Sequence, residues 1–209
     1  PESLDGIVAR RVDFLTDYQN AAYAEEYRGF VEKVRHVSEA LALAVARNLF
    51  KLMAYKDEYE VARLYTDGRF AENLAKQFKG NFTLKYHLAP PILGRRDDFT
   101  GKPLKTEFGP WMKMCFKFLA KLKPFRGTAL DIFGRTAERK MERQLIADYR
   151  TTVESLLPNV SASNIITAVE IASLPQSIRG FGHVKQASAE KARSREAELL
   201  RVFAAAKRD

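Results

Sequence analysis

The 209-residue sequence has a single cysteine, Cys115, and only three histidines, which lie far apart. One cysteine cannot form a disulfide within the chain, and an iron–sulfur cluster usually takes about four thiolates, so neither feature is expected here. The histidine spacing does not match a zinc site. The chain has no run of 18 apolar residues and no apolar stretch typical of a signal peptide near its start, so we expect a cytoplasmic protein that does not enter the membrane.

The first residue is Pro1 rather than methionine, which suggests that the sequence is part of a longer polypeptide. Hydrophobic residues make up 46% and charged residues 29%, which is ordinary for a globular protein. The net charge of +9 is uneven, because residues 81–150 hold 15 basic and 7 acidic side chains. Residues 1–80 hold 12 basic and 13 acidic side chains. We therefore expect an acidic partner to dock on the middle third.

The hydrophobic periodicity predicts a mainly α fold, namely a multi-helix bundle with one small antiparallel β-hairpin. Ser3, Ser38, Thr136 and Ser161 are placed to cap four of the helices. Gly29 falls inside a predicted helix, where glycine is costly, so we expect close packing around it. The predicted helices cover residues 4–19, 21–37, 41–67, 69–78, 110–123, 136–157, 162–173 and 188–206.

Alternating apolar residues predict the two strands of the hairpin, at about 82–88 and 103–108. We expect the chain to form one helical domain, 1–209, with the hairpin region inserted at about 81–109 and a final helix at about 188–206. The loop between the strands should be rich in charge, since it carries Arg95, Arg96, Asp97 and Asp98.

The predicted helix 41–67 is the most unusual stretch, because its apolar face becomes charged toward the end. Lys56, Glu60 and Arg63 continue the row of leucines and could form a buried ladder of ion pairs at i,i+3 and i,i+4 spacing. The alternative is a pocket in which Lys56 and Arg63 meet an anion or an acidic partner.

A second unusual stretch, residues 174–185, combines glycines with cationic side chains. Arg179, His183 and Lys185 could form an anion or coenzyme clamp, or the segment could be a connector whose arginine binds carboxylates of the fold. It matches neither a dinucleotide-binding fingerprint nor a P-loop. Glu138 and Glu142, on the helix before it, are interleaved with arginines and are expected to lie on a solvated face.

The order and spacing of several segments resemble one family, the fused bacterial indolepyruvate ferredoxin oxidoreductases, in their C-terminal region. The similarity is close over about residues 40–187. The segments are FKLMAYKDEYEVARLYTD at 50–67, YHLAPPIL at 86–93, FGPW at 108–111, RGTALDIFG at 126–134, ERKMERQLIADY at 138–149 and LPQSIRGFGHVK at 174–185.

The resemblance implies a parent enzyme that decarboxylates aryl 2-oxo acids oxidatively to acyl-CoA, using thiamine diphosphate, coenzyme A and iron–sulfur clusters, with ferredoxin as electron acceptor. None of these cofactors is expected in this segment, and no catalytic residue carries over to it. The expected partners are the upstream catalytic domains of the same chain or a second subunit.

Three hypotheses remain open from the sequence. The first is a non-catalytic domain that packs on catalytic domains. The second is a module in which Lys56, Arg63, Arg126, Arg179 and Lys185 surround an anion such as the coenzyme A phosphates. The third, a nucleic-acid-binding domain, is not favoured because it rests on net charge alone and no helix-turn-helix or RNA-binding motif accompanies it.

Overall fold

The computed structural model describes residues 2–80, 82–88 and 104–206. These residues form a mainly α fold with one two-stranded antiparallel sheet, which confirms the predicted fold class. The chain divides into two compact units. We name Pro1–Tyr55 with Arg135–Asp209 the bundle unit and Lys56–Gly134 the inserted unit.

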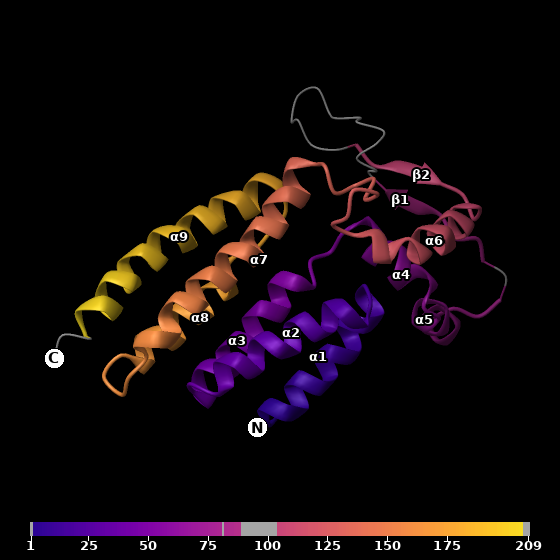
Figure 1. Cartoon of the computed structure of the whole chain (residues 1–209). Coiled ribbons are helices and arrows are strands. Elements are labelled where there is room, and N and C mark those ends of the chain that lie inside the picture. Colours follow the sequence, from indigo (N-terminus) through magenta and orange to yellow (C-terminus); the bar gives the residue numbers. More distant parts are fainter. Residues whose placement is uncertain (1, 81, 89–103, 207–209) are drawn as a thin grey trace. The chain divides into compact units, whose positions relative to one another are not determined.

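In the bundle unit, α3 (Glu39–Met53) is the central helix (Figure 1). It packs against α1 (Leu4–Tyr18), α2 (Ala21–Arg35) and two later helices, and most of its side chains are buried. Its first turn is capped by the predicted residue, since the Ser38 hydroxyl accepts the N–H of Leu41 at 3.3 Å. A helix buried on several sides needs apolar residues around much of its circumference, which the sequence ALALAVA supplies.

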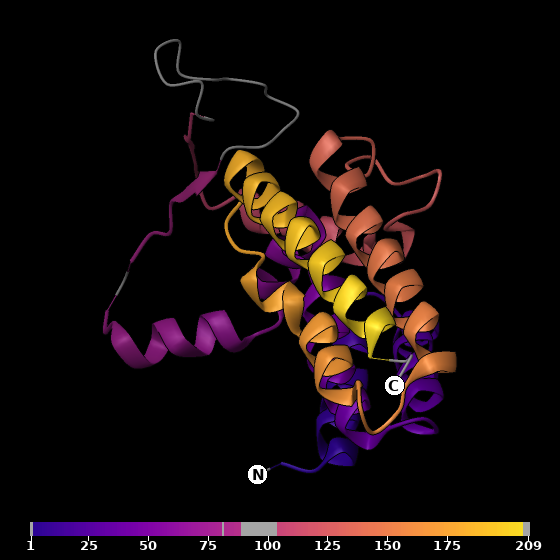
Figure 2. The same ribbon diagram turned by 90° about the vertical axis from the view of Figure 1, so that its left-hand side faces the viewer.

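The second half of the bundle unit contains α7 (Ala137–Leu156), α8 (Ile165–Ser173) and α9 (Gly182–Ala205). Both α7 and α8 pack on α3, and α9 runs beside α8 (Figure 2). The Tyr149 hydroxyl of α7 donates to the carbonyl of Ala172 in α8 at 2.8 Å, which satisfies a buried polar pair.

The final helix starts earlier than the sequence indicated. We predicted a start near Ser188, but α9 begins at Gly182. Gly180 and Gly182 have positive φ values of 90° and 54°, so the chain turns sharply into a helix over residues where the sequence predicts a loop. Ser188 lies within the helix, and its hydroxyl accepts the backbone N–H of Arg179 at 3.1 Å.

The predicted continuous helix 41–67 is wrong, because it breaks after Met53 and a new helix, α4 (Glu58–Thr66), begins after four intervening residues. Two tyrosine hydroxyls stabilise the break by donating hydrogen bonds to backbone carbonyls that would accept backbone N–H groups if the helix continued. Tyr23 donates to the carbonyl of Met53 at 3.0 Å, and Tyr18 donates to that of Tyr55 at 2.7 Å. Asp57 then caps α4 by accepting the N–H of Glu60 at 2.8 Å.

The inserted unit places α4, α6 (Met112–Lys121) and the hairpin around a small aromatic core. The strands β1 (Tyr86–Leu88) and β2 (Thr106–Phe108) pair with Tyr86 opposite Phe108, and both are shorter than predicted. The rings of Tyr65 and Phe116 stack at 5.0 Å, with Tyr86 edge-on to both. The helix α5 (Arg69–Gln77) follows α4, and the predicted basic loop at 95–98 lies outside the described residues.

Candidate functional site

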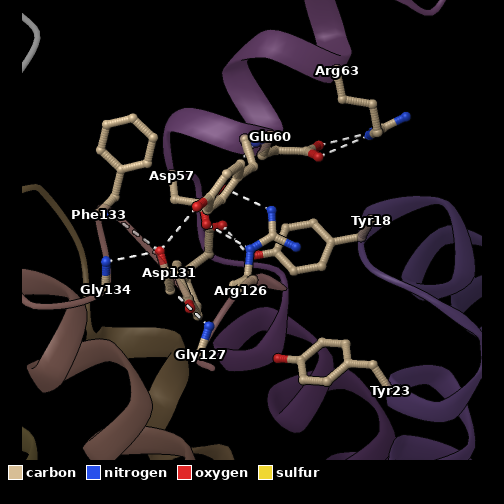
Figure 3. Close-up of polar contacts among 12 residues, drawn as sticks. Tyr18, Tyr23, Asp57, Glu60, Arg63, Arg126, Gly127, Asp131, Phe133 and Gly134 are labelled. Atoms are coloured by element: carbon tan, nitrogen blue, oxygen red, sulfur yellow. Dashed lines mark hydrogen bonds and ion pairs between the residues drawn. The ribbon is translucent and has the colours of Figure 1, made fainter. Parts of the chain in front are cut away.

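Asp57 and Arg126 are among the most buried charged residues of the inserted unit, with exposed fractions of 3% and 4%. The guanidinium of Arg126 donates from Nε to Asp57 Oδ2 at 2.6 Å and from Nη2 to Asp57 Oδ1 at 2.9 Å (Figure 3). The same guanidinium lies 5.5 Å from the ring centroid of Tyr59. This two-point ion pair, which we call the Asp57–Arg126 clamp, uses the planar guanidinium in the geometry that best matches a carboxylate.

A second buried carboxylate, Asp131, organises the segment that follows Arg126. It accepts the backbone N–H groups of Gly127 at 2.7 Å, Phe133 at 3.1 Å and Gly134 at 2.9 Å (Figure 3). It also accepts the Tyr59 hydroxyl at 3.1 Å. One side chain therefore satisfies four donors and fixes residues 127–134 as a tight loop against α4.

Burial, and after it the negative charge of Asp131, raises the pKa of Tyr59 above the usual value of a phenol. The phenol therefore stays protonated at neutral pH and serves as a hydrogen-bond donor. A general base needs a pKa near the working pH, and the Tyr59 pKa is shifted in the opposite direction. The cluster around Asp131 has the properties of a structural network.

The predicted row of charges on α4 is only partly present. Arg63 donates from Nε and Nη2 to the two oxygens of Glu60, both at 2.8 Å, and its Nη1 lies 3.7 Å from Asp67 Oδ2. Lys56, which we expected to start the buried ladder, is exposed. The reason is the helix break: Lys56 precedes the cap of α4 and does not share a helical face with Glu60.

In the bundle unit, Lys185 of α9 donates to both oxygens of Glu142 of α7, at 2.7 and 2.6 Å. Glu142 is 4% exposed, so the expectation of a solvated face is wrong for this residue. Arg179 and His183, the other cations of the predicted clamp, are exposed. The side chain of Arg179 donates to the carbonyl of Gln176 at 3.4 Å. The three cations therefore do not share one set of contacts.

Lys51, in the last turn of α3, holds the segment that precedes α9 in place. Its ammonium donates to the carbonyls of Pro175 at 2.6 Å, Gln176 at 3.1 Å and Ile178 at 3.0 Å. Burial, with the nearby positive charges of Arg179 and Lys185, lowers the pKa of Lys51. Three carbonyls occupy the three N–H donors of the ammonium, so Lys51 acts here as a cap for the segment.

The sequence patterns above do not indicate Asp57, Lys51 or the central role of Asp131. One signal was available for Asp57, because Asp57 and Glu60 have the spacing of a helix N-terminus, in which a cap residue is followed three positions later by an acidic residue. No comparable signal exists for the pairing of Asp57 with Arg126, which is 69 residues away in the sequence.

The bundle unit also contains a cavity of about 330 Å³ whose lining includes residues of α3, α7, α8 and α9. Its surroundings carry the ion pair of Arg193 with Asp148 at 3.0 Å and the hydrogen bond from Thr152 to Glu196 at 2.9 Å. None of the cations predicted as site residues lines it. The apolar lining residues are Leu52, Leu145, Ile171, Leu174, Pro175, Ile178, Ala189 and Ala192.

Two further properties concern only the part of the chain that the structure describes. No cluster of three or more His, Cys, Asp or Glu side chains there could hold a metal ion. Within the same residues, no helix combines the length and the apolar composition needed to cross a membrane.

Comparison with known proteins gives one match. A family model, described as a family of unknown function (DUF6537), matches residues 4–198. No curated protein and no solved structure matches the chain. The match covers most of both compact units and assigns no activity to either.

Proposed function

The chain belongs to the DUF6537 family, and we propose that it is a non-catalytic structural and assembly domain of a larger protein that resembles the indolepyruvate ferredoxin oxidoreductases. In this proposal the parent enzyme decarboxylates aryl 2-oxo acids to acyl-CoA in the cytoplasm and reduces ferredoxin. Its thiamine diphosphate, coenzyme A and iron–sulfur clusters are bound by other parts of the enzyme. The single Cys115 supports this division, since a cluster usually needs about four thiolates.

One observation carries the proposal: three cations predicted as site residues, one buried and two half-buried, are paired with buried carboxylates of their own unit. Arg126 binds Asp57, Arg63 binds Glu60, and Lys185 binds Glu142. Removing one partner of a buried pair costs about 3–5 kcal/mol, so these carboxylates are strong competitors for any incoming anion. Such pairs fix helices and loops in place, which is what a rigid assembly domain requires.

The same observation gives less support to the coenzyme A hypothesis. Of the five cations in that hypothesis, the three named above already have carboxylate partners, whereas Lys56 and Arg179 are exposed. Calorimetry with coenzyme A at millimolar concentration tests it directly. We expect no binding heat, and a saturable heat that disappears in Arg179→Ala would favour the ligand-binding hypothesis over the assembly role.

The assembly role is tested by expressing the chain separately from the remainder of the parent polypeptide. We expect the chain alone to show no 2-oxo acid-dependent reduction of ferredoxin. We expect the remainder to bind the chain in pull-down and sedimentation experiments and to gain thermal stability when it is added. Activity in the isolated chain, or failure to bind and stabilise the remainder, would contradict the proposal.

A further inference from the structure

The helix α6 leaves one of its apolar sides uncovered. Trp111, Met114 and Phe118 follow each other at intervals of three and four residues, so they lie on one side, beginning at the residue before the helix. Their exposed fractions are 59%, 68% and 65%. The opposite side, with Met112 and Phe116, is buried in the aromatic core next to α4.

A row of lysines runs beside this apolar side. Lys113, Lys117 and Lys121 are spaced four residues apart and are all exposed. Within the described residues, none of them forms an ion pair with a carboxylate. Lys117 and Lys121 each follow an apolar residue of the row by three positions, which places ammonium groups next to Met114 and Phe118.

Exposed apolar side chains are concentrated in the inserted unit. Among the described residues, ten of the fifteen exposed large hydrophobic side chains belong to Lys56–Gly134, although this unit is the smaller one. Single exposed apolar residues need no explanation, but a continuous row with charged neighbours is typical of a binding surface. Tryptophan, methionine and phenylalanine are also the types enriched at the centres of protein interfaces.

We propose that the α6 docking face, defined as Trp111, Met114 and Phe118 with Lys113, Lys117 and Lys121, binds an apolar segment flanked by carboxylates on the catalytic part of the parent protein. The inference rests on the assembly role proposed above and names the surface and the chemistry of its partner. The apolar row supplies the buried centre of the interface. The three ammonium groups, which pair with no carboxylate among the residues that the structure describes, supply the charge complementarity at its rim.

The test uses Trp111, because it is the only tryptophan of the chain and lies in the proposed face. The remainder of the parent polypeptide, with its own tryptophans replaced by phenylalanine, is titrated into the complete chain. We expect the Trp111 emission to shift to shorter wavelength and its quenching by acrylamide to fall. The double variant Met114→Ser/Phe118→Ser should bind at least about tenfold more weakly, a loss of at least about 1.4 kcal/mol, because a few apolar residues at the centre of an interface carry most of the binding energy.

Charge is tested separately. Lys113→Glu/Lys117→Glu/Lys121→Glu should weaken binding, and added salt should weaken the wild-type complex while changing that of the variant less. Control variants carry comparable changes at exposed positions of the bundle unit: Ile166→Ser/Val202→Ser for the apolar row and Lys140→Glu/Lys191→Glu for the lysines. The controls should bind as the wild type does, and circular dichroism should show that all variants are folded.

The outcomes separate this inference from the assembly role. If the complex forms but Trp111 emission stays unchanged and both face variants bind normally, the docking face is wrong and the assembly role stands. If no complex forms, both are wrong. A blue shift that rises with the concentration of the chain alone, with dimers in sedimentation, would identify a second copy as the occupant. A blue shift of the Trp111 emission on addition of phosphatidylserine–phosphatidylcholine vesicles would identify an anionic membrane as the occupant. Either result would overturn the proposal that the face binds an acidic segment of the parent protein.

Discussion

Asp57 and Arg126 are joined by two hydrogen bonds of 2.6 and 2.9 Å, although they are 69 residues apart in the sequence. They lie near the two ends of the inserted unit, and the bond from Tyr59 to Asp131 makes a second connection of the same kind. Both connections therefore join the first residues of the inserted unit to its last ones. Because Asp57 is also the cap of α4, the closure is coupled to the start of that helix.

Asp57→Ala should destabilise the inserted unit by about 3–5 kcal/mol, since it leaves a buried guanidinium without its carboxylate and removes a helix cap. The measurement is urea unfolding followed by the fluorescence of Trp111, which belongs to that unit. Lys85→Ala, which breaks an exposed ion pair with Glu107 in the same unit, serves as the control and should change the free energy of unfolding by less than about 1 kcal/mol. An Asp57→Ala loss no larger than that of the control would show that the clamp is dispensable.

Two glycine substitutions should have opposite effects. A Cβ on Gly134 would overlap the carboxylate of Asp131, so Gly134→Ala should destabilise the inserted unit by about 1–3 kcal/mol. A Cβ on Gly29 in α2 meets no atom within 4 Å, so the expected close packing there is wrong. Gly29→Ala should therefore stabilise the bundle unit by up to about 1 kcal/mol. Differential scanning calorimetry of both variants checks this, and equal signs would contradict the geometry.

The stability of the protein should fall at alkaline pH. Below about pH 10, Tyr59 is protonated in both the folded and the unfolded chain, so its contribution is constant. Above about pH 10 the unfolded phenol ionises while the raised pKa keeps the folded one protonated, so the free energy of unfolding decreases as pH rises. Tyr59→Phe should lose about 1 kcal/mol at pH 7 and show a shallower alkaline decline.

Urea unfolding at pH 7, 9 and 11, followed by circular dichroism, gives the alkaline slopes. Tyr149, whose pKa is raised by burial, provides a parallel case in the bundle unit, and Tyr149→Phe should also flatten the decline. Identical slopes in the wild type and both variants would mean that neither phenol is protected in the folded protein.

Lys185→Met should destabilise the bundle unit by about 2–3 kcal/mol, because the carboxylate of Glu142 stays buried and loses both of its hydrogen bonds from Lys185. The matched control is Lys191→Met on the same helix, at an exposed position, with an expected change of less than about 0.5 kcal/mol. Thermal unfolding followed by circular dichroism distinguishes the two. A control that loses as much stability as Lys185→Met would point to the helix itself and not to the ion pair.

Local features of the fold could be predicted from the sequence. The caps at Ser3, Ser38 and Thr136 each accept a backbone N–H three residues later, as expected. The predicted cap at Ser161 is wrong, because α8 begins later, after Asn164. Most helix boundaries also agree, since they depend on periodicity, capping residues and proline, all of which act over a few residues. The break after Met53 was missed because Tyr18 and Tyr23, which stabilise it, lie on other segments.

In the candidate site, the contacts that the sequence could not predict are again those between distant segments. The sequence identified Arg63, Arg126 and Lys185 as unusual cations, but it could not show whether each one faces a ligand or a carboxylate. Arg63 has its partner three residues away, and that contact could be inferred from helical spacing. The partners of Arg126 and Lys185 lie 69 and 43 residues away.

The sequence by itself determined the helical class, the hairpin, the positions of most caps and the excess of positive charge in the middle third. Only the tertiary structure decided that Arg63, Arg126 and Lys185 are paired with carboxylates inside their own units, and that α6 exposes an apolar row beside its lysines. The physical reason is that helix and strand formation depends on neighbours within a few residues. The partner of a buried charge and the exposure of a helix face depend on segments that the folded chain brings together from far apart.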